Sequence, residues 1–229
     1  VPVRKTADED YAYFANRNFV YLTGMEQKDT ILMLEKDASG YRETLFILPP
    51  NLIEERWTGA RMKPEEIEAA SMISNFAYRD TFEEELKKVL ASGRIEKVYL
   101  DIDRMDGQVV VSGADSMETF LKQEYPNLLI ENSLPILKKL RLIKKPCEIR
   151  AMEKAQEITK AGILAMMTHS KPGMYEYQYK AEYDYALAQH GVLEAGFPSI
   201  ISAGKNNFCI HYYGYRGQAM DGDIVLNDV

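Results

Sequence analysis

The feature that most constrains the fold is a series of short apolar runs, first close together and then alternating with helical patterns. Three such runs, rich in Val, Ile, Leu, Phe and Tyr, are Phe19 to Leu22, Thr30 to Leu34 and Thr44 to Leu48. Glycines and prolines stand between them, as expected where strands are joined by turns. The sequence therefore predicts three successive strands near the start of the chain.

Helical patterns follow these runs and alternate with further strand-like residues. Pro64, followed by two glutamates, is typical of the first turn of a helix, where proline costs little and acids offset the dipole. Thr81 and Glu84 have the spacing of a capping box that opens another helix. Val98 to Leu100 is a further strand candidate, and Asp115 to Glu124 a further helix. This order predicts an α/β domain in which helices flank a mixed sheet.

A basic segment divides the sequence in two. Residues 134–147 contain five Lys and Arg together with two prolines, and their composition differs from that of both sides. Domain boundaries fall preferentially in such segments. We therefore expect one domain over residues 1–133, a basic linker over 134–147 and a second domain over 148–229.

The second domain is expected to open with two helices. Apolar residues recur at helical spacing from Ile149 to Met167, and Lys171-Pro172-Gly173 ends that helix. Residues 175–190 form a second helical pattern, which ends at Gly191. The strand-like runs that follow are Phe197 to Gly204, Phe208 to Tyr213 and Asp223 to Val229.

The charge balance argues against a nucleic-acid partner. Lys and Arg total 28 against 35 Asp and Glu, so the formal net charge is −7 and the isoelectric point is near 5.2. Such a balance does not suit a surface that follows a phosphate backbone. Apolar runs such as Leu45 to Leu48 are also far shorter than the ~20 residues that cross a bilayer. We therefore expect neither nucleic acid nor a membrane as a partner.

The number of cysteines and the first five residues of the sequence indicate where in the cell the protein works. Cys147 and Cys209 are too few for a disulfide framework and their spacing matches no zinc finger, so we expect reduced thiols in a cytoplasmic protein. Residues 1–5 hold neither an initiator Met nor an apolar signal core, so the numbering is expected to begin after a removed segment. Export stays open if that segment was a signal.

Two polar residues in strand-like runs are candidates for a functional site. His211 lies within residues 208–213, where a titratable ring needs either a partner or a task. Asp228 follows the apolar residues 224–226, and an acid at the end of a buried strand is costly unless it is hydrogen-bonded, faces solvent or binds a metal. Residue chemistry alone does not decide whether His211 and Asp228 have a functional or a structural role. Cys209 is expected to be a small buried hydrophobe, because no basic cluster is adjacent in sequence.

Segments in both halves of the chain follow the pattern of one known family. They are, in order, Phe14 to Gly24, Leu45 to Pro49, Glu55 to Arg61, Leu140 to Ile149, Gly196 to Ile200, Ser202 to Asn207, Ile210 to Tyr212 and Gly222 to Asp228. In their order and spacing these segments resemble the aminopeptidase P branch of the pita-bread metallopeptidases, a family that includes prolidase and creatinase. The resemblance runs over nearly the whole chain.

The resemblance implies both a fold and an activity. The fold would be a creatinase-type N-terminal α/β domain followed by the opening portion of an α+β pita-bread catalytic domain. The activity would be that of a metallopeptidase, usually manganese-dependent, that uses two divalent ions to remove an N-terminal residue preceding proline. Peptides with proline in the second position would be its substrates, and we expect a homodimer or a higher homo-oligomer.

The resemblance also implies roles for four residues. Asp228 matches the first metal-ligating Asp of the family, and His211 matches a substrate-side His that assists the tetrahedral intermediate. Trp57 and Arg61 match substrate-binding residues that reach a neighbouring subunit's active site in an oligomer. The remaining ligands, a second Asp, a His and two Glu, would follow Asp228. Because one carboxylate cannot hold two divalent ions, we expect these 229 residues to be a fragment that is inactive by itself.

Three alternatives stay open. A prolidase-type dipeptidase would share the site and differ in residues that close the pocket. A non-catalytic binding module would use the same fold as a docking platform, because a fold does not dictate its function. Retention of both Asp228 and His211 favours the enzyme over that module. A creatine hydrolase is disfavoured because Tyr21 to Gly24 and Trp57 to Arg61 are closer to aminopeptidase P.

Overall fold

The computed structural model describes residues 5–7, 11, 13–38, 40–103 and 112–229. The chain divides into two compact units, Val1–Leu142 and Ile143–Val229. This division falls inside the segment that was expected to link two domains. That segment is itself helical, since it contains α6 (Leu134–Leu142) and the first residues of α7 (Pro146–His169). Residues 1–4, on which the expectation of a removed leader mainly rests, lie outside the described part.

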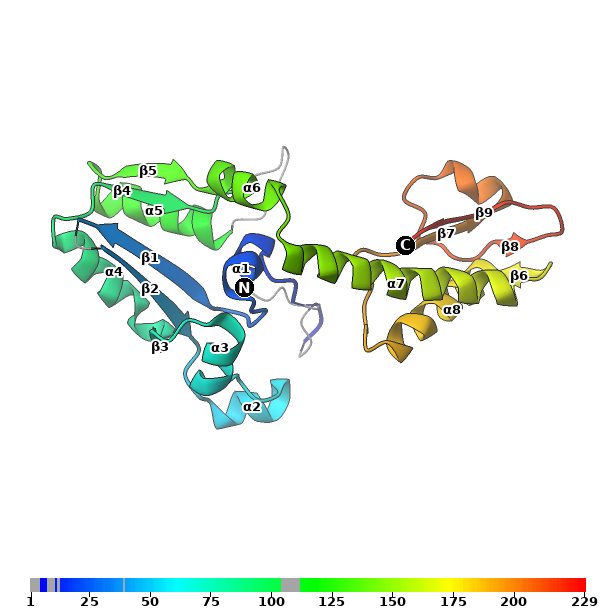
Figure 1. Cartoon of the computed structure of the whole chain (residues 1–229), viewed down its shortest axis with the longest axis horizontal. Helices are drawn as coiled ribbons and strands as arrows, with labels where there is room; N and C mark the ends of the chain where they lie inside the picture. The colour runs from blue at the N-terminus through cyan, green and yellow to red at the C-terminus, as the bar shows by residue number, and fades with distance from the viewer. Residues whose placement is uncertain (1–4, 8–10, 12, 39, 104–111) are drawn as a thin grey trace. The chain divides into compact units, whose positions relative to one another are not determined.

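Unit 1 contains two sheets with helices packed against them (Figure 1). Its elements before α6 are α1 (Arg17–Thr23), β1 (Ile31–Asp37), β2 (Gly40–Ile47), α2 (Leu52–Thr58), α3 (Pro64–Ser71), β3 (Phe76–Tyr78), η1 (Arg79–Thr81), α4 (Phe82–Ala91), β4 (Lys97–Leu100), α5 (Gly113–Glu124) and β5 (Leu129–Asn132). β1 pairs with β2 in antiparallel register and β2 with β3 in parallel register, so this sheet is mixed, as predicted. β4 and β5 form a parallel pair.

The central strand β2 is buried on both faces, and this places the core of unit 1. Leu45 and Ile47 point to one face, where Ile67 of α3 packs against them. Phe46 points to the opposite face, where it and Phe82 pack as a T-shaped pair of rings with 5.0 Å between centroids. Successive side chains of a strand alternate between faces, so a run of apolar residues suits a strand covered on both sides.

The predicted strand at Phe19 to Leu22 is wrong, because these residues lie in helix α1. The Asn16 side chain accepts hydrogen bonds from the backbone N–H groups of Asn18 and Phe19, at 2.8 and 2.9 Å. Gly24 ends the helix with a left-handed φ of 69°. Asn at the N-cap and Gly after the last turn are strong helix-boundary signals, and here they outweigh the strand preference of the apolar residues between them.

The other expected elements of unit 1 are present, with one difference at a helix start. The helix expected after Thr81 is α4, but the Thr81 hydroxyl donates to the carbonyl of Tyr78 at 2.8 Å and makes no cap hydrogen bond to the helix. The short 3₁₀ helix η1 leads directly into α4 and replaces the capping box. The predicted strand at Val98 and the predicted helix at Asp115 are β4 and α5.

Unit 2 is built on two packed helices and two small antiparallel sheets. After α7 its elements are β6 (Met174–Tyr175), α8 (Glu176–Gln189), β7 (Ile200–Ala203), η2 (Gly204–Phe208), β8 (Gln218–Ala219) and β9 (Val225–Asp228). β6 pairs with β8, and β7 pairs with β9. The two helices expected from periodicity are confirmed as α7 and α8. No helix in the described ranges has both the length and the apolar composition needed to cross a bilayer.

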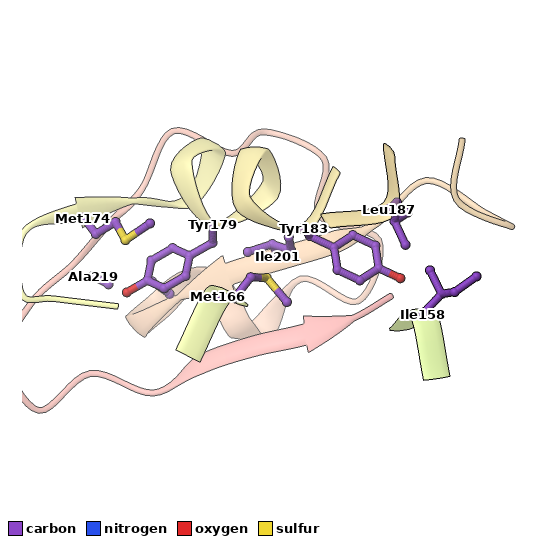
Figure 2. Packing of buried hydrophobic residues seen from close by; sticks show 9 residues of the cluster. Ile158, Met166, Met174, Tyr179, Tyr183, Leu187, Ile201 and Ala219 are labelled. Carbon is purple, nitrogen blue, oxygen red and sulfur yellow. The ribbon is translucent and has the colours of Figure 1, made fainter. Parts of the chain in front are cut away.

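The core of unit 2 forms where both helices meet β7 (Figure 2). Met166 of α7, Tyr179 and Tyr183 of α8 and Ile201 of β7 are each at most 3% exposed. Aromatic and sulfur-containing side chains supply large contact areas in such a small core. The core holds α8 and β7 in fixed positions, and the candidate site is attached to both.

Candidate functional site

One buried carboxylate anchors the loop that joins β7 to β8. Glu176, the first residue of α8, is 0% exposed. Its Oε1 accepts hydrogen bonds from the backbone N–H of Ala203 and from the side-chain amide of Asn206, both at 2.8 Å. Its Oε2 accepts from the backbone N–H of Gly217 at 2.7 Å and from the hydroxyl of Tyr212 at 2.8 Å. A buried charge is tolerated only with such partners, and four donors satisfy this one.

Burial and hydrogen bonding act in opposite directions on the pKa of Glu176. Burial is the largest single influence and raises this pKa, because it penalises the charged form. The hydrogen bonds from Asn206, Tyr212 and two backbone N–H groups together outweigh burial, so the pKa lies below its ordinary value. Burial also raises the pKa of the Tyr212 hydroxyl, and its hydrogen bond to Glu176 adds to that rise. At neutral pH the pair is therefore a carboxylate accepting from a neutral phenol.

The far end of the loop requires glycine. A Cβ at Gly217 would lie 2.4 Å from Oε1 of Glu176 and 2.4 Å from Nδ2 of Asn206. Real Cβ atoms do not approach other heavy atoms so closely, so any side chain here would push the carboxylate from its donors. The Asn206 amide also lies 3.1 Å from the Tyr212 hydroxyl, which closes the network.

His211 lies in this loop, and the strand predicted for residues 208–213 is wrong. The 3₁₀ helix η2 ends at Phe208, and a turn follows it. The side chains of Phe208 and Ile210 are 91% and 83% exposed, so the apolar residues of this run do not enter the core of unit 2. The His211 ring is exposed as well, and it stacks on Tyr213 with 6.2 Å between centroids. Cys209 is exposed, contrary to the expectation that it would be buried.

Asp228 is the last residue of β9, where it lies opposite Ile200 of β7. The expectation of a buried strand is wrong, because β9 is largely exposed, with Leu226 at 37% and Asp228 itself exposed. β7 nevertheless connects the two parts of the site. Its first residue faces Asp228, and its last, Ala203, donates to Glu176. The structure therefore brings Asp228 and the loop of His211 into one small unit.

Trp57 and Arg61 belong to unit 1, on and just after α2. The Asn51 side chain caps this helix by accepting from the N–H groups of its second and third residues. Trp57 is 81% exposed. The Arg61 guanidinium donates to the carbonyl of Pro49 and to the carboxylate of Glu54, and its side chain is 15% exposed. Arg61 thus ties α2 to the segment that follows β2, and it lines a hollow of about 440 Å³.

The described residues do not by themselves fit a dinuclear metal centre. Within these ranges no three or more His, Cys, Asp and Glu side chains are grouped as metal ligands. Asp228 offers one carboxylate, whereas a divalent ion of the magnesium or manganese type takes several oxygen or imidazole ligands. Any further ligands must therefore come from other residues.

Sequence reasoning missed Glu176, Asn206 and Tyr212. An acid in the first turn of a helix is ordinarily an exposed residue that offsets the dipole, so Glu176 gave no signal of burial. Its four donors lie 27, 30, 36 and 41 residues further along the chain. Only the folding of α8 against β7 brings them to one point.

Comparison with known families decides the affiliation of the chain. Residues 1–99 match the family model of the aminopeptidase P N-terminal domain, and residues 150–229 match that of metallopeptidase family M24. The chain therefore joins an aminopeptidase P N-terminal domain to the first part of a metallopeptidase family M24 domain. The expected fold is confirmed: an aminopeptidase P N-terminal domain precedes the start of an M24 pita-bread domain.

Individual relatives agree with this M24 affiliation. The chain is 27% identical to the Xaa-Pro aminopeptidase of Escherichia coli, a match over 99% of the chain and 52% of that protein. Human Xaa-Pro aminopeptidase 3 is 25% identical, over 96% of the chain and 44% of that protein. The chain therefore spans about half the length of the curated relatives that it matches.

Solved structures of aminopeptidase P match the whole length of this chain. A Bacillus anthracis protein assigned as an aminopeptidase P matches with a TM-score of 0.94 and 31% identity, covering 100% of this chain and 54% of that one. Zinc-substituted E. coli aminopeptidase P in complex with product matches with a TM-score of 0.83 and 26% identity, covering 100% and 52%. The order of the two units is thus that of aminopeptidase P.

Proposed function

We propose that the protein to which this chain contributes is a Xaa-Pro aminopeptidase, which removes an N-terminal residue that precedes proline. The proposal is carried by the position of Asp228 and His211. Both lie in the M24 part of the chain, Asp228 opposite the first residue of β7 and His211 in the loop that follows that strand. Two relatives that match nearly the whole chain are Xaa-Pro aminopeptidases. Proline's amide carries no N–H, so its peptide bond calls for a specialised peptidase.

The four residues take the following roles in this proposal. Asp228 supplies one carboxylate to a pair of divalent ions, which we propose to be manganese. The exposed His211 ring donates a hydrogen bond to the oxygen that becomes negative in the tetrahedral intermediate, which lowers the barrier electrostatically. Trp57, which is exposed, and Arg61, whose guanidinium also holds α2, both contact substrate at a neighbouring subunit's site.

Residues 1–229 alone are proposed to be inactive. Among the described residues, no three potential metal ligands lie close together. A site for two metal ions would therefore need ligands from other residues. The proposed division is a domain over 1–133, a basic connection over 134–147 and a catalytic portion over 148–229. The protein is further proposed to be a cytoplasmic homodimer or higher homo-oligomer.

A substrate panel tests the proposed activity. The complete polypeptide encoded by the gene, and residues 1–229, are each stripped of metal, supplied with Mn²⁺ and offered three peptides: a tripeptide with proline second, the same tripeptide with alanine second, and a Xaa-Pro dipeptide. We expect the complete polypeptide to cleave the proline tripeptide best, and residues 1–229 to cleave none. A preference for the dipeptide would make the protein a prolidase. Binding without cleavage by the complete polypeptide would make it a docking module, and cleavage by residues 1–229 would overturn the inactivity.

A further inference from the structure

The loop that carries His211 is held at both ends and in its middle by a single side chain. Ala203, before the loop, and Gly217, at its end, each donate a backbone N–H to the Glu176 carboxylate. Tyr212, the residue next to His211, donates its hydroxyl to the same carboxylate at 2.8 Å. The Glu176 backbone N–H also donates to the carbonyl of Gly217 at 2.9 Å.

Other contacts hold the loop on either side of His211: the Asn207 amide donates to the carbonyl of Ile224 at 2.9 Å, and the Tyr215 hydroxyl donates to the carbonyl of Ser199. The side chains on either side of the loop's middle are exposed, with Ile210 at 83% and Tyr213 at 48%. Tyr215 adopts a left-handed φ of 51°, which is unfavourable for a residue with a side chain and persists only where neighbouring contacts enforce it. Of the two residues that adjoin His211, the half-buried Tyr212 is the one whose side chain is hydrogen-bonded to another part of unit 2.

We infer that Glu176 is a positioning residue for His211, acting through the Tyr212 hydroxyl to set where the exposed imidazole stands. The inference rests on the proposed function only for the task of His211. The geometric relation itself is a property of residues 1–229. Glu176, at the start of α8, thereby gains a role in the site, although it lies 35 residues before His211 in the sequence.

Replacing the carboxylate by an amide must break this arrangement. Each oxygen of Glu176 accepts from one backbone N–H and one side chain. The Asn206 amide can flip and the Tyr212 hydroxyl can turn to accept, but a backbone N–H can only donate. The glutamine introduced by Glu176→Gln has one oxygen, so in either orientation its own N–H donor faces the N–H of Ala203 or of Gly217. Glu176→Gln therefore tests the ends of the loop together with its middle.

Tyr212→Phe tests the middle alone. It removes one hydroxyl and leaves Glu176 its donors from Ala203, Asn206 and Gly217. Tyr213→Phe is the matched control, since it removes the hydroxyl of the tyrosine that follows Tyr212. The Tyr213 hydroxyl has no hydrogen-bond partner in the described part of the chain. Both variants keep an aromatic ring, so the stacking partner of His211 is retained.

The readout is the His211 ring signal in a ¹H–¹³C NMR spectrum of residues 1–229, with the methyl signals of Ile201 as a check on the core. We expect one sharp His211 signal displaced from its random-coil position. Tyr212→Phe and Glu176→Gln should lose most of this displacement, and Tyr213→Phe should keep it. If Glu176→Gln does not fold, Tyr212→Phe decides alone.

Two outcomes overturn the inference. A wild-type His211 signal at the random-coil position would show that the ring is not positioned. A displaced signal unchanged in Tyr212→Phe, with the Ile201 methyls intact, would leave Glu176 a purely structural role. The spectrum requires no catalysis, so failure of the peptidase proposal in the substrate panel stays distinguishable from failure here.

Discussion

The ring of Tyr183 lies directly over Gly162, so that a Cβ on Gly162 would be 2.4 Å from Cδ2 and 2.6 Å from Cε2 of the ring. Gly162 is in α7 and Tyr183 in α8, and the absence of a side chain at position 162 allows the two helices to pack. Glycine inside a helix ordinarily costs roughly 0.5–1 kcal/mol relative to alanine. The close approach explains why this cost is accepted in the middle of a long helix.

Gly162→Ala is expected to destabilise unit 2. Overpacking a close contact costs typically about 1–3 kcal/mol, which exceeds the gain of roughly 1 kcal/mol in helix propensity. Urea unfolding followed by circular dichroism measures the change. Gly113→Ala at the start of α5 is the matched control, because a Cβ there meets nothing within 4 Å. Equal effects of the two substitutions would contradict the contact with Tyr183.

The stability of unit 2 is expected to fall in acid because of Glu176. Its pKa is below the ordinary 4.5 in the folded state, so its contribution is fully present above about pH 4.5. That contribution is lost as the pH falls from 4.5 through the folded pKa, because the proton binds the unfolded chain more tightly. Glu176→Gln removes this part of the pH dependence and lowers stability at neutral pH by about 1–3 kcal/mol through an unsatisfied N–H.

The control for this acid effect is Glu194→Gln, an exposed glutamate of the same unit. We expect this variant to keep the wild-type dependence of the free energy of unfolding on pH below pH 4.5. An unchanged slope in Glu176→Gln would mean that the buried carboxylate does not cause the acid sensitivity of unit 2.

Periodicity predicted most elements of this chain, and local boundary chemistry explains the main miss. The spacing of apolar residues located α7 and α8, and β-rich runs located β1 and β2, because each element buries one regular set of side chains. Phe19 to Leu22 is too short for a period to distinguish helix from strand. Asn16 and Gly24, which do distinguish them, were the available signals.

The site was less predictable than the fold because its contacts are distant in sequence. His211 was singled out as a residue in an apolar run, but the exposed side chains of Phe208 and Ile210 show that the run does not alternate into a core. The Glu176 network joins residues up to 41 positions apart. No local pattern carries that information, and only the packed core of unit 2 creates it.

Trp57 and Arg61 are expected to differ sharply in their effect on stability. Arg61→Lys replaces a planar fork with two partners, Pro49 and Glu54, by a single ammonium, and should lower the stability of unit 1 by about 1 kcal/mol. Trp57→Ala should change it by less than about 0.5 kcal/mol, because the indole is 81% exposed. Chemical unfolding of both variants measures this, and a larger loss at Trp57 would show a packing role for the indole.

His211→Ala in the complete polypeptide is expected to reduce kcat for a proline-second tripeptide by about 10²–10³-fold, the usual cost of losing one donor to a developing oxyanion. KM should change little, because such a donor acts mainly in the transition state. His169→Ala is the control: it is the same substitution at the end of α7, where the imidazole pairs with Glu182 at 2.7 Å, and it should leave kcat unchanged. A rise in KM with kcat retained in His211→Ala would assign His211 to substrate binding, because uniform binding is lost from KM alone.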